Sequence, residues 1–211
     1  MTRLPISLLL AVFLVPVTAQ GASTAQQDYD NAVRLTADPD RGARTFSSCA
    51  VCHGAYGGGS ADGRVPRIAG QHRRVVIRQL VDYRHEKRWD PVMEHMADDH
   101  LLPDAQAIAD VAGFVTSLSA PVPAGTGQAS YLDVGRQTYG ARCSGCHGAK
   151  GQGDEGKAVP RLAGQHYAYL LRQFYDAIDG RRPQLSRSHE GPLHKLDRDA
   201  LQGMADLLSR Y

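Results

Sequence analysis

The chain has 211 residues, a formal net charge of +2, 42% hydrophobic residues and a single tryptophan. That length suits one large domain or two small ones. A unit of about 80 residues with this composition buries a thin core and usually needs an additional staple. The basic residues are scattered along the chain, so we expect no nucleic-acid partner.

Residues 1–19 are typical of a secretory signal peptide. Arg3 supplies a positive charge, residues 6–17 form a short apolar run, and small residues follow it. The run is shorter than the ~20 residues that cross a bilayer, which makes an uncleaved anchor the weaker alternative. We expect cleavage after Ala19 or Ala22 and a periplasmic mature protein.

The rest of the chain predicts helices joined by loops, without convincing strand alternation, so we expect an all-α fold. Residues 20–35 are interpreted as a loose N-terminal lead. Glycine-rich stretches predict loops at 54–63 and 148–156, and we also expect loops at 88–97 and 181–190. Apolar residues at helical spacing predict helices over 40–48, 73–84 and 105–118, and a last helix that carries Leu201, Met204, Leu207 and Leu208.

An internal repeat divides the chain into two modules. The Pro-Arg-Ile-Ala-Gly-Gln-His segment at 66–72 recurs as Pro-Arg-Leu-Ala-Gly-Gln-His at 160–166, an offset of 94 residues. Upstream, a glycine and an aromatic residue four positions later recur at an offset of 93 (Gly42 and Phe46; Gly135 and Tyr139). Two copies are too few for a solenoid. We therefore expect domains at 36–119 and 130–211, joined by a linker at 120–129 that is rich in proline and glycine.

Each module contains one Cys-x-x-Cys-His motif, and the two motifs use all four cysteines (Cys49, Cys52 and His53; Cys143, Cys146 and His147). Two cysteines three positions apart can each form a thioether to a heme vinyl group, and the adjacent histidine then lies below the iron. Disulfides within each pair, a thioredoxin-like redox motif and a four-cysteine zinc site are the alternatives. None of them explains the two histidines, so we expect two covalently bound heme c groups.

These motifs, the Gly-x-x-x-aromatic first helix and the repeated Pro-Arg-x-Ala-Gly-Gln-His segment resemble class I cytochromes c. The tandem arrangement over residues 38–211 resembles the diheme, cytochrome c4-like group. The resemblance implies two small helical domains, each around one heme. It also implies that the carbonyl groups of Pro66 and Pro160 accept a hydrogen bond from the proximal histidines, His53 and His147, and so fix their rings.

The sixth iron ligand of the first module is open between three residues. Family members usually place a methionine in the segment before the last helix. Met93 matches that pattern best, since it follows an Asp-Pro pair, whereas counting back from the next helix favours Met96. The internal repeat favours His95.

The second module departs from the family pattern. It has no methionine in the corresponding segment, and its only methionine, Met204, has the spacing of a core residue. We predict His189 as the sixth ligand, with His194 as the alternative. An iron without either ligand would be open to small molecules. His72 and His166 are expected to start helices, and we assign no role to His85 or His100.

A heme bound on both sides can change oxidation state but does not readily bind substrate. The sequence therefore predicts an electron carrier between redox proteins: a dehydrogenase or quinol-oxidising complex as donor, and a terminal oxidase or reductase as acceptor. Any membrane association would come through those partners. A second histidine lowers the reduction potential relative to methionine, so electrons should enter at the second module. The alternatives are a peroxidase-like or sulfur-compound-oxidising enzyme and the heme subunit of a dehydrogenase.

Overall fold

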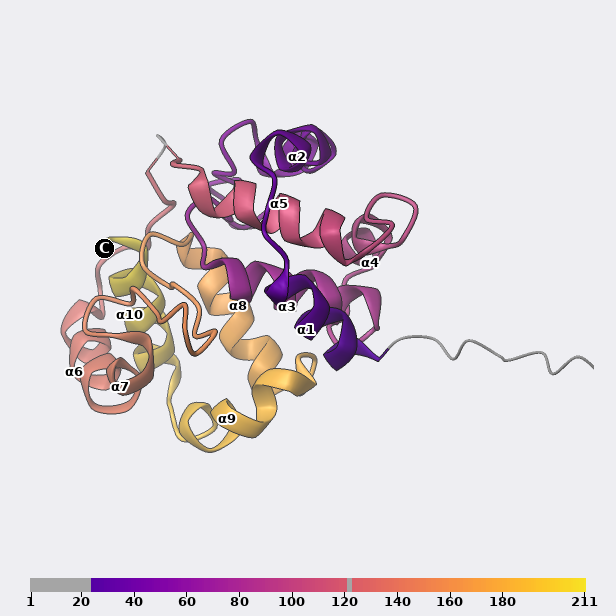
Figure 1. Ribbon diagram of the computed structural model, residues 1–211. Coiled ribbons are helices and arrows are strands. Elements are labelled where there is room, and N and C mark those ends of the chain that lie inside the picture. The colour runs from indigo at the N-terminus through magenta and orange to yellow at the C-terminus, as the bar shows by residue number, and fades with distance from the viewer. Residues whose placement is uncertain (1–23, 121–122) are drawn as a thin grey trace, which may run out of the picture.

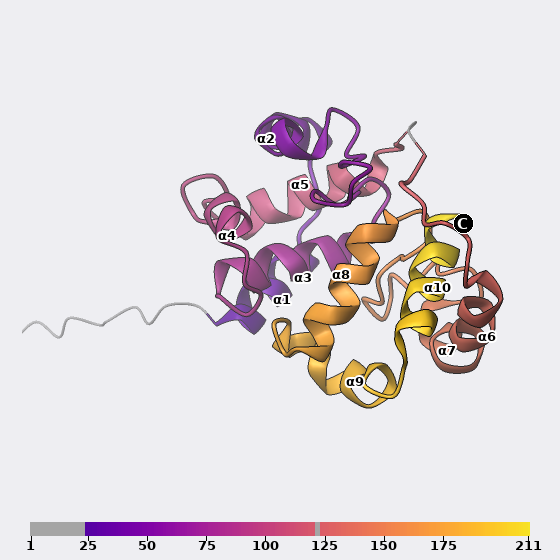
Figure 2. The same ribbon diagram turned by 180° about the vertical axis from the view of Figure 1, so that it is seen from behind.

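The computed structural model describes residues 24–120 and 123–211, so the predicted signal peptide lies outside the described residues. Figure 1 shows two helical lobes that follow each other along the chain, and Figure 2 shows them from behind. Within the described residues the only β-pairing is one isolated bridge, which confirms the all-α prediction. The helices are α1 Ala25–Arg34, α2 Pro39–His53, α3 Arg73–Arg84, α4 Pro91–Ala97, α5 Ala105–Ser117, α6 Leu132–Arg142, α7 Ser144–His147, α8 Tyr167–Ile178, α9 Pro183–Leu193 and α10 Arg198–Ser209.

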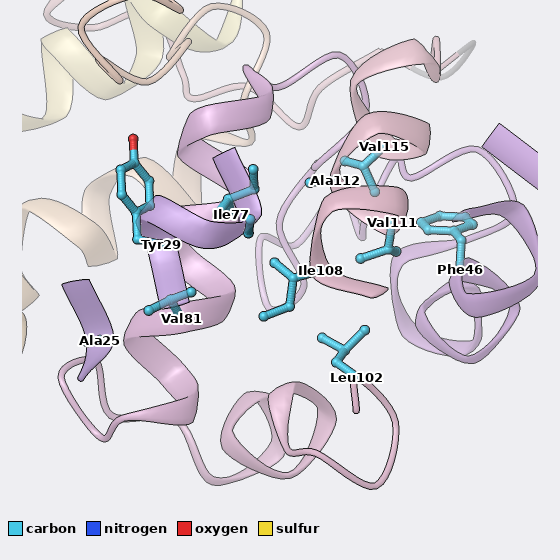
Figure 3. Close-up of a cluster of buried hydrophobic side chains, with 11 residues drawn as sticks. Ala25, Tyr29, Phe46, Ile77, Val81, Leu102, Ile108, Val111, Ala112 and Val115 are labelled. Carbon is cyan, nitrogen blue, oxygen red and sulfur yellow. The ribbon is translucent and has the colours of Figure 1, made fainter. Parts of the chain in front are cut away.

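The first lobe packs α1, α2 and α3 around α5, and its core is continuous (Figure 3). The second lobe packs α6 and α8 against α10, with α9 on α8. An isolated helix of this length is only marginally stable in water. The short helices are therefore stabilised by burying one apolar face each in the core. The buried core residues of the first lobe are Ala25, Tyr29, Ala32, Phe46, Ile77, Val81, Leu102, Ile108, Val111, Ala112 and Val115, and those of the second are Tyr139, Leu170, Ala177, Leu193, Leu201, Met204, Ala205, Leu207 and Leu208.

Residues 25–34 are not a loose lead, and that prediction is wrong for this stretch. They form α1, which begins with a capping box between Thr24 and Gln27. Ala25, Tyr29 and Ala32 lie three and four positions apart, so they share the face that enters the core of the first lobe. The mostly polar composition of the stretch concealed this short apolar face.

The two segments predicted as loops before the last helices are also helical. Asp90 caps α4 by accepting hydrogen bonds from the backbone N–H groups of Val92 and Met93, and Pro91 occupies the first turn. Pro183 is the first residue of α9. A proline has a fixed φ that suits the first turn of a helix, and its missing N–H is not needed there.

A glycine contact joins two helices in each lobe. A Cβ added at Gly42 in α2 would lie 2.3 Å from the backbone oxygen of Asp110 in α5. A Cβ added at Gly135 in α6 would lie 2.1 Å from the carbonyl carbon of Gly203 in α10. Backbones can approach this closely only where no side chain intervenes, which explains why the glycine recurs in the sequence repeat.

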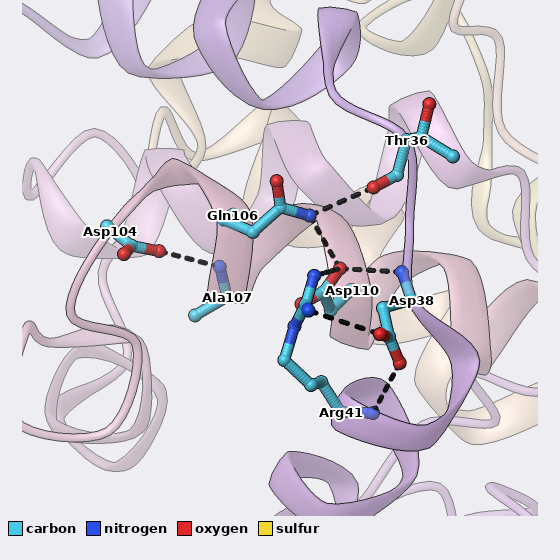
Figure 4. A network of polar contacts seen from close by, with 7 residues as sticks. All are labelled: Thr36, Asp38, Arg41, Asp104, Gln106, Ala107 and Asp110. Carbon is cyan, nitrogen blue, oxygen red and sulfur yellow. Dashed lines mark hydrogen bonds and ion pairs between the residues drawn. The ribbon is translucent and has the colours of Figure 1, made fainter.

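A buried carboxylate reinforces the contact in the first lobe (Figure 4). Asp110, 1% exposed, accepts hydrogen bonds from Arg41 Nε at 2.6 Å, from the backbone N–H of Asp38 at 2.7 Å and from Gln106 Nε2 at 2.7 Å. Burial alone would raise the pKa of this carboxyl, but the hydrogen bonds outweigh it and lower the pKa below 3.8. The charged form of Asp110 therefore ties α2 to α5.

We expect the Asp110→Asn variant to lose about 2 kcal/mol of stability at neutral pH, since its hydrogen bonds lose their charge. A carboxyl whose pKa is lowered by folding stabilises the protein above its unfolded pKa, and this contribution disappears as the pH falls through the folded pKa. The stability difference from wild type should therefore shrink below about pH 4. Denaturant unfolding at several pH values, with the exposed Asp133→Asn as control, measures it. A difference that does not change with pH would contradict this account.

The two lobes contact each other through matching residues of the repeat. Gln71 of the first lobe accepts from the backbone N–H of Arg161 and donates to its carbonyl, both at 2.9 Å. Gln165 of the second lobe does the same with Arg67, at 2.9 and 2.7 Å. Residues at equivalent positions thus exchange equivalent bonds, as in an isologous dimer interface.

The histidines that follow these glutamines extend the interface. His72 and His166 are the N-cap residues of α3 and α8, which confirms the expectation that they start helices. Each ring donates through Nε2 to a carbonyl of the other lobe: His72 to Gln152 at 2.8 Å and His166 to Gly58 at 2.7 Å. Within the described residues no helix is long and apolar enough to cross a bilayer.

Candidate heme sites

The first candidate site lies at the C-terminal end of α2. The predicted helix over 40–48 extends in the structure to His53, so Cys49, Cys52 and His53 lie on one continuous helix. His53 is 6% exposed, and its Nδ1 lies 3.0 Å from the carbonyl oxygen of Pro66. A carbonyl only accepts, so Nδ1 carries the proton and Nε2 has the lone pair that a metal needs.

The second candidate site has the same geometry on two helices. α6 ends before Cys143, and the short α7 carries Cys146 and His147. His147 is 8% exposed, and its Nδ1 lies 3.1 Å from the carbonyl oxygen of Pro160. The carbonyl groups of Pro66 and Pro160 thus each contact, and so orient, a buried histidine ring.

The protonation of both rings suits metal binding. Burial lowers the pKa of His53, against the opposing effects of the Pro66 hydrogen bond and the charge of Asp90. Burial also lowers the pKa of His147, and the neighbouring His189 lowers it further. Neutral imidazole is the form that coordinates a metal.

No disulfide joins the two cysteines of either pair. In each pair the first cysteine is half-buried and the second is exposed. Among the residues that the structure describes, no group of three or more histidine, cysteine or acidic side chains is arranged to hold a metal ion by itself. The two pairs therefore do not converge on a zinc site, and the geometry favours two independent attachment sites.

His189 faces His147 across the second site. It lies on α9, with the ring centroids 6.0 Å apart and the planes inclined by 51°. A metal bound between two imidazoles would separate their centroids by roughly 6 Å, from bonds of about 2 Å and ring radii near 1 Å. Nδ1 of His189 lies 3.2 Å from the carbonyl oxygen of Leu185, which places the proton on Nδ1 and the lone pair on Nε2. The alternative, His194, is exposed just beyond the end of α9.

The three candidates of the first site all lie on α4. Met93 and Met96 are half-buried, whereas His95 is exposed and stacks on His100 at 4.4 Å between ring centroids. The carboxylate of Asp90 accepts a hydrogen bond from the backbone N–H of Met93 at 3.2 Å. Burial lowers the pKa of His53, and the negative charge of Asp90 opposes that shift. The N-terminal end of α4 therefore lies close to the first site, and Met93 belongs to that end.

The fold and the sites define the class of protein: two tandem helical domains, each equipped to hold a porphyrin iron through two thiols and an oriented histidine. The cytochrome c family model matches residues 39–119 and 132–198, and the chain belongs to this family. It is similar to cytochrome c4 of Azotobacter vinelandii, 31% identical over 151 residues, which span 64% of this chain and 69% of the relative.

Two further similarities extend this result. The thiosulfate dehydrogenase electron acceptor of Stutzerimonas stutzeri is 36% identical over 135 residues, which cover 60% of this chain and 61% of that protein. The crystal structure of reduced recombinant cytochrome c4 from Pseudomonas stutzeri has the same fold, with a TM-score of 0.71 and 24% sequence identity. The match covers 82% of this chain and 98% of that chain. The chain is thus a cytochrome c4-like diheme electron carrier with two covalently bound heme c groups.

Two features of the sites escaped the sequence analysis. Asp90 was noticed only as the neighbour of a proline, yet it caps α4 and lies near His53. Arg182 was not singled out, yet its positive charge adds to burial in lowering the pKa of His189. A signal was available for Arg182, because it stands 94 residues after Arg88, the same offset as the cysteines.

Proposed function

We propose that the chain is a periplasmic shuttle that takes electrons from a sulfur-compound dehydrogenase and passes them to a terminal oxidase or reductase. The observation that carries the proposal is the facing pair His147 and His189, 6.0 Å apart. Such a pair closes the second iron on both sides, and a closed iron transfers electrons without binding substrate. Bound heme c supplies reversible one-electron chemistry at its iron.

In this proposal each side chain has a defined task. Cys49, Cys52, Cys143 and Cys146 attach the two hemes, and His53 and His147 bind the irons through Nε2. The carbonyl groups of Pro66 and Pro160 hold the two rings in orientation. His189 closes the second site, and Met93 on α4 closes the first.

The proposed direction of transfer follows from unequal ligand pairs. Two imidazoles donate more strongly to iron than an imidazole and a thioether, which lowers the potential of the second site relative to the first. Electrons would then enter at the second domain and leave from the first. The reciprocal contacts of Gln71 and Gln165 support this route, because they keep the two domains docked.

The names of two relatives suggest the donor. Both are thiosulfate dehydrogenase electron acceptors, from Stutzerimonas stutzeri and Thiomonas intermedia. We therefore propose a thiosulfate-oxidising enzyme as the donor. Export would remove residues 1–19, and the intact mass of the purified protein should equal the shortened chain plus two hemes.

Stopped-flow spectroscopy of the oxidised protein tests the carrier role. With thiosulfate and a catalytic amount of a thiosulfate dehydrogenase, we expect rapid uptake of two electrons per chain. With thiosulfate alone, or with peroxide added to the reduced chain, we expect no turnover. Catalytic consumption of thiosulfate or peroxide by the chain alone would contradict the proposal and favour an enzyme. Slow reduction by the dehydrogenase, with fast reduction by another donor, would overturn the proposed partner alone.

A further inference from the structure

Two arginines from equivalent positions meet between the domains. Arg88 precedes α4 and is 8% exposed, and Arg182 precedes α9 and is half-buried. They are 94 residues apart, so they are copies of each other in the repeat. Two guanidinium groups in one low-dielectric region repel each other, and proteins keep such an arrangement only where other groups fix it.

Two glutamines, also copies of each other, fix this pair. The side-chain oxygen of Gln173 accepts from Arg88 at 2.9 Å and from Arg182 at 2.7 Å. The side-chain oxygen of Gln79 also accepts from both arginines, at 3.0 Å from Arg182. The four side chains form a closed ring of hydrogen bonds that spans the two domains, which we call the Arg–Gln ring (Arg88, Arg182, Gln79 and Gln173).

Two tyrosines also contact Arg88. The hydroxyl of Tyr169, from the second domain, accepts from Arg88 at 2.8 Å, and the guanidinium lies 4.7 Å from the ring centroid of Tyr83. The hydrogen bonds that Arg88 donates go to side-chain oxygens of Gln79, Tyr169 and Gln173. Burial alone would raise the pKa of Tyr169, but the charges of Arg88 and Arg182 outweigh it and lower the pKa. Burial, and then the charge of Arg88, lower the pKa of Arg182 to about 10, so both arginines remain charged at neutral pH.

The Arg–Gln ring adjoins the two helices that carry the proposed sixth ligands. Arg182 directly precedes α9, and α9 carries His189, which faces His147. Arg88 stands two residues before Asp90, the N-cap of α4, and α4 carries Met93. Asp176 also faces the ring, because it accepts from Gln173 at 2.9 Å, but it is paired with Arg181. Two charged arginines thus stand at the starts of the two helices that carry Met93 and His189.

We propose that the Arg–Gln ring is a shared positive charge that raises the reduction potentials of both hemes. Reduction adds one negative charge at an iron, and a nearby positive charge in a low-dielectric region stabilises that state. Arg88 comes from the first domain but is held by side chains of the second. Removing the charge of Arg88 should therefore change the reduction potential of the heme in the second domain as well.

This inference rests on the proposed carrier function, and potentiometric titration of the diheme protein tests it separately. In Arg88→Gln, one positive charge is removed, and we expect the midpoint potentials of both hemes to fall. Arg88→Lys keeps the charge and should stay close to wild type. Arg34→Gln removes an exposed arginine of α1 and should change neither potential.

A second variant serves if Arg88→Gln does not fold. Gln79→Glu places a carboxylate between the two guanidinium groups without loss of volume, and both potentials should again fall. Visible and EPR spectra check that the iron ligands are unchanged in each variant. Unchanged potentials, or a shift of the first-domain heme alone, would overturn the inference. An open iron in the wild-type spectrum would instead contradict the proposed function.

Discussion

Gly135→Ala is expected to destabilise the second domain by about 3 kcal/mol, the upper range for an overpacked contact. The added methyl group would lie 2.1 Å from the carbonyl carbon and 2.2 Å from the carbonyl oxygen of Gly203. Both are backbone atoms of α10, so no side chain can move aside. α6 and α10 would have to separate, and the core around Tyr139 and Met204 would open with them.

Gly140→Ala provides a matched control for this prediction. Gly140 lies on the same helix, and a Cβ added there meets no atom within 4 Å. Alanine at this exposed position should stabilise the helix by up to about 1 kcal/mol. Denaturant unfolding followed by circular dichroism measures both variants. Equal stability of the two would show that the close approach of α6 to α10 does not hold the domain together.

His189→Ala is expected to open the second heme site to small molecules. The ring of His189 lies opposite His147, and alanine leaves that side of the iron without a protein ligand. The reduced variant should bind one carbon monoxide molecule per chain, whereas the reduced wild type should bind none on the same timescale. The oxidised variant should show one high-spin heme beside one low-spin heme.

His194→Ala is the control, because His194 is the alternative ligand and lies five residues further along the chain. We expect this variant to behave like wild type. If His194→Ala opens the heme and His189→Ala does not, the assignment of the sixth ligand is reversed. If neither variant binds carbon monoxide, the second iron has a ligand that neither histidine supplies.

The sequence is sufficient to predict two helical domains and the contacts of His53 with Pro66 and of His147 with Pro160. The Cys-x-x-Cys-His motif is a local feature, because residues within one helix turn lie close together in space. Its two thiols and its imidazole are therefore neighbours whatever the rest of the fold. The spacing from His53 to Pro66, and from His147 to Pro160, is the same in both copies, and the structure has the same contact in both. Local chemistry of this kind needs no knowledge of the tertiary fold.

The distal side and the interface are harder to predict, because they depend on how helices pack. The segment before each last helix was taken as a loop, yet α4 and α9 are helices that present Met93 and His189. The repeat marks Gln71 and Gln165 as equivalent, but a repeat alone does not say that they bind each other's domain. Only the three-dimensional arrangement reveals that contact.

Low-temperature EPR of the oxidised wild-type protein, with a near-infrared spectrum, tests the central claim most directly. Two closed, unequal hemes should give two low-spin signals of equal intensity: one typical of histidine and methionine ligands, the other of two histidines. Two identical signals would contradict the assignment of His189 or of Met93. A high-spin signal in the wild type would mean an open iron, and the account of this chain as a pure electron carrier would then be wrong.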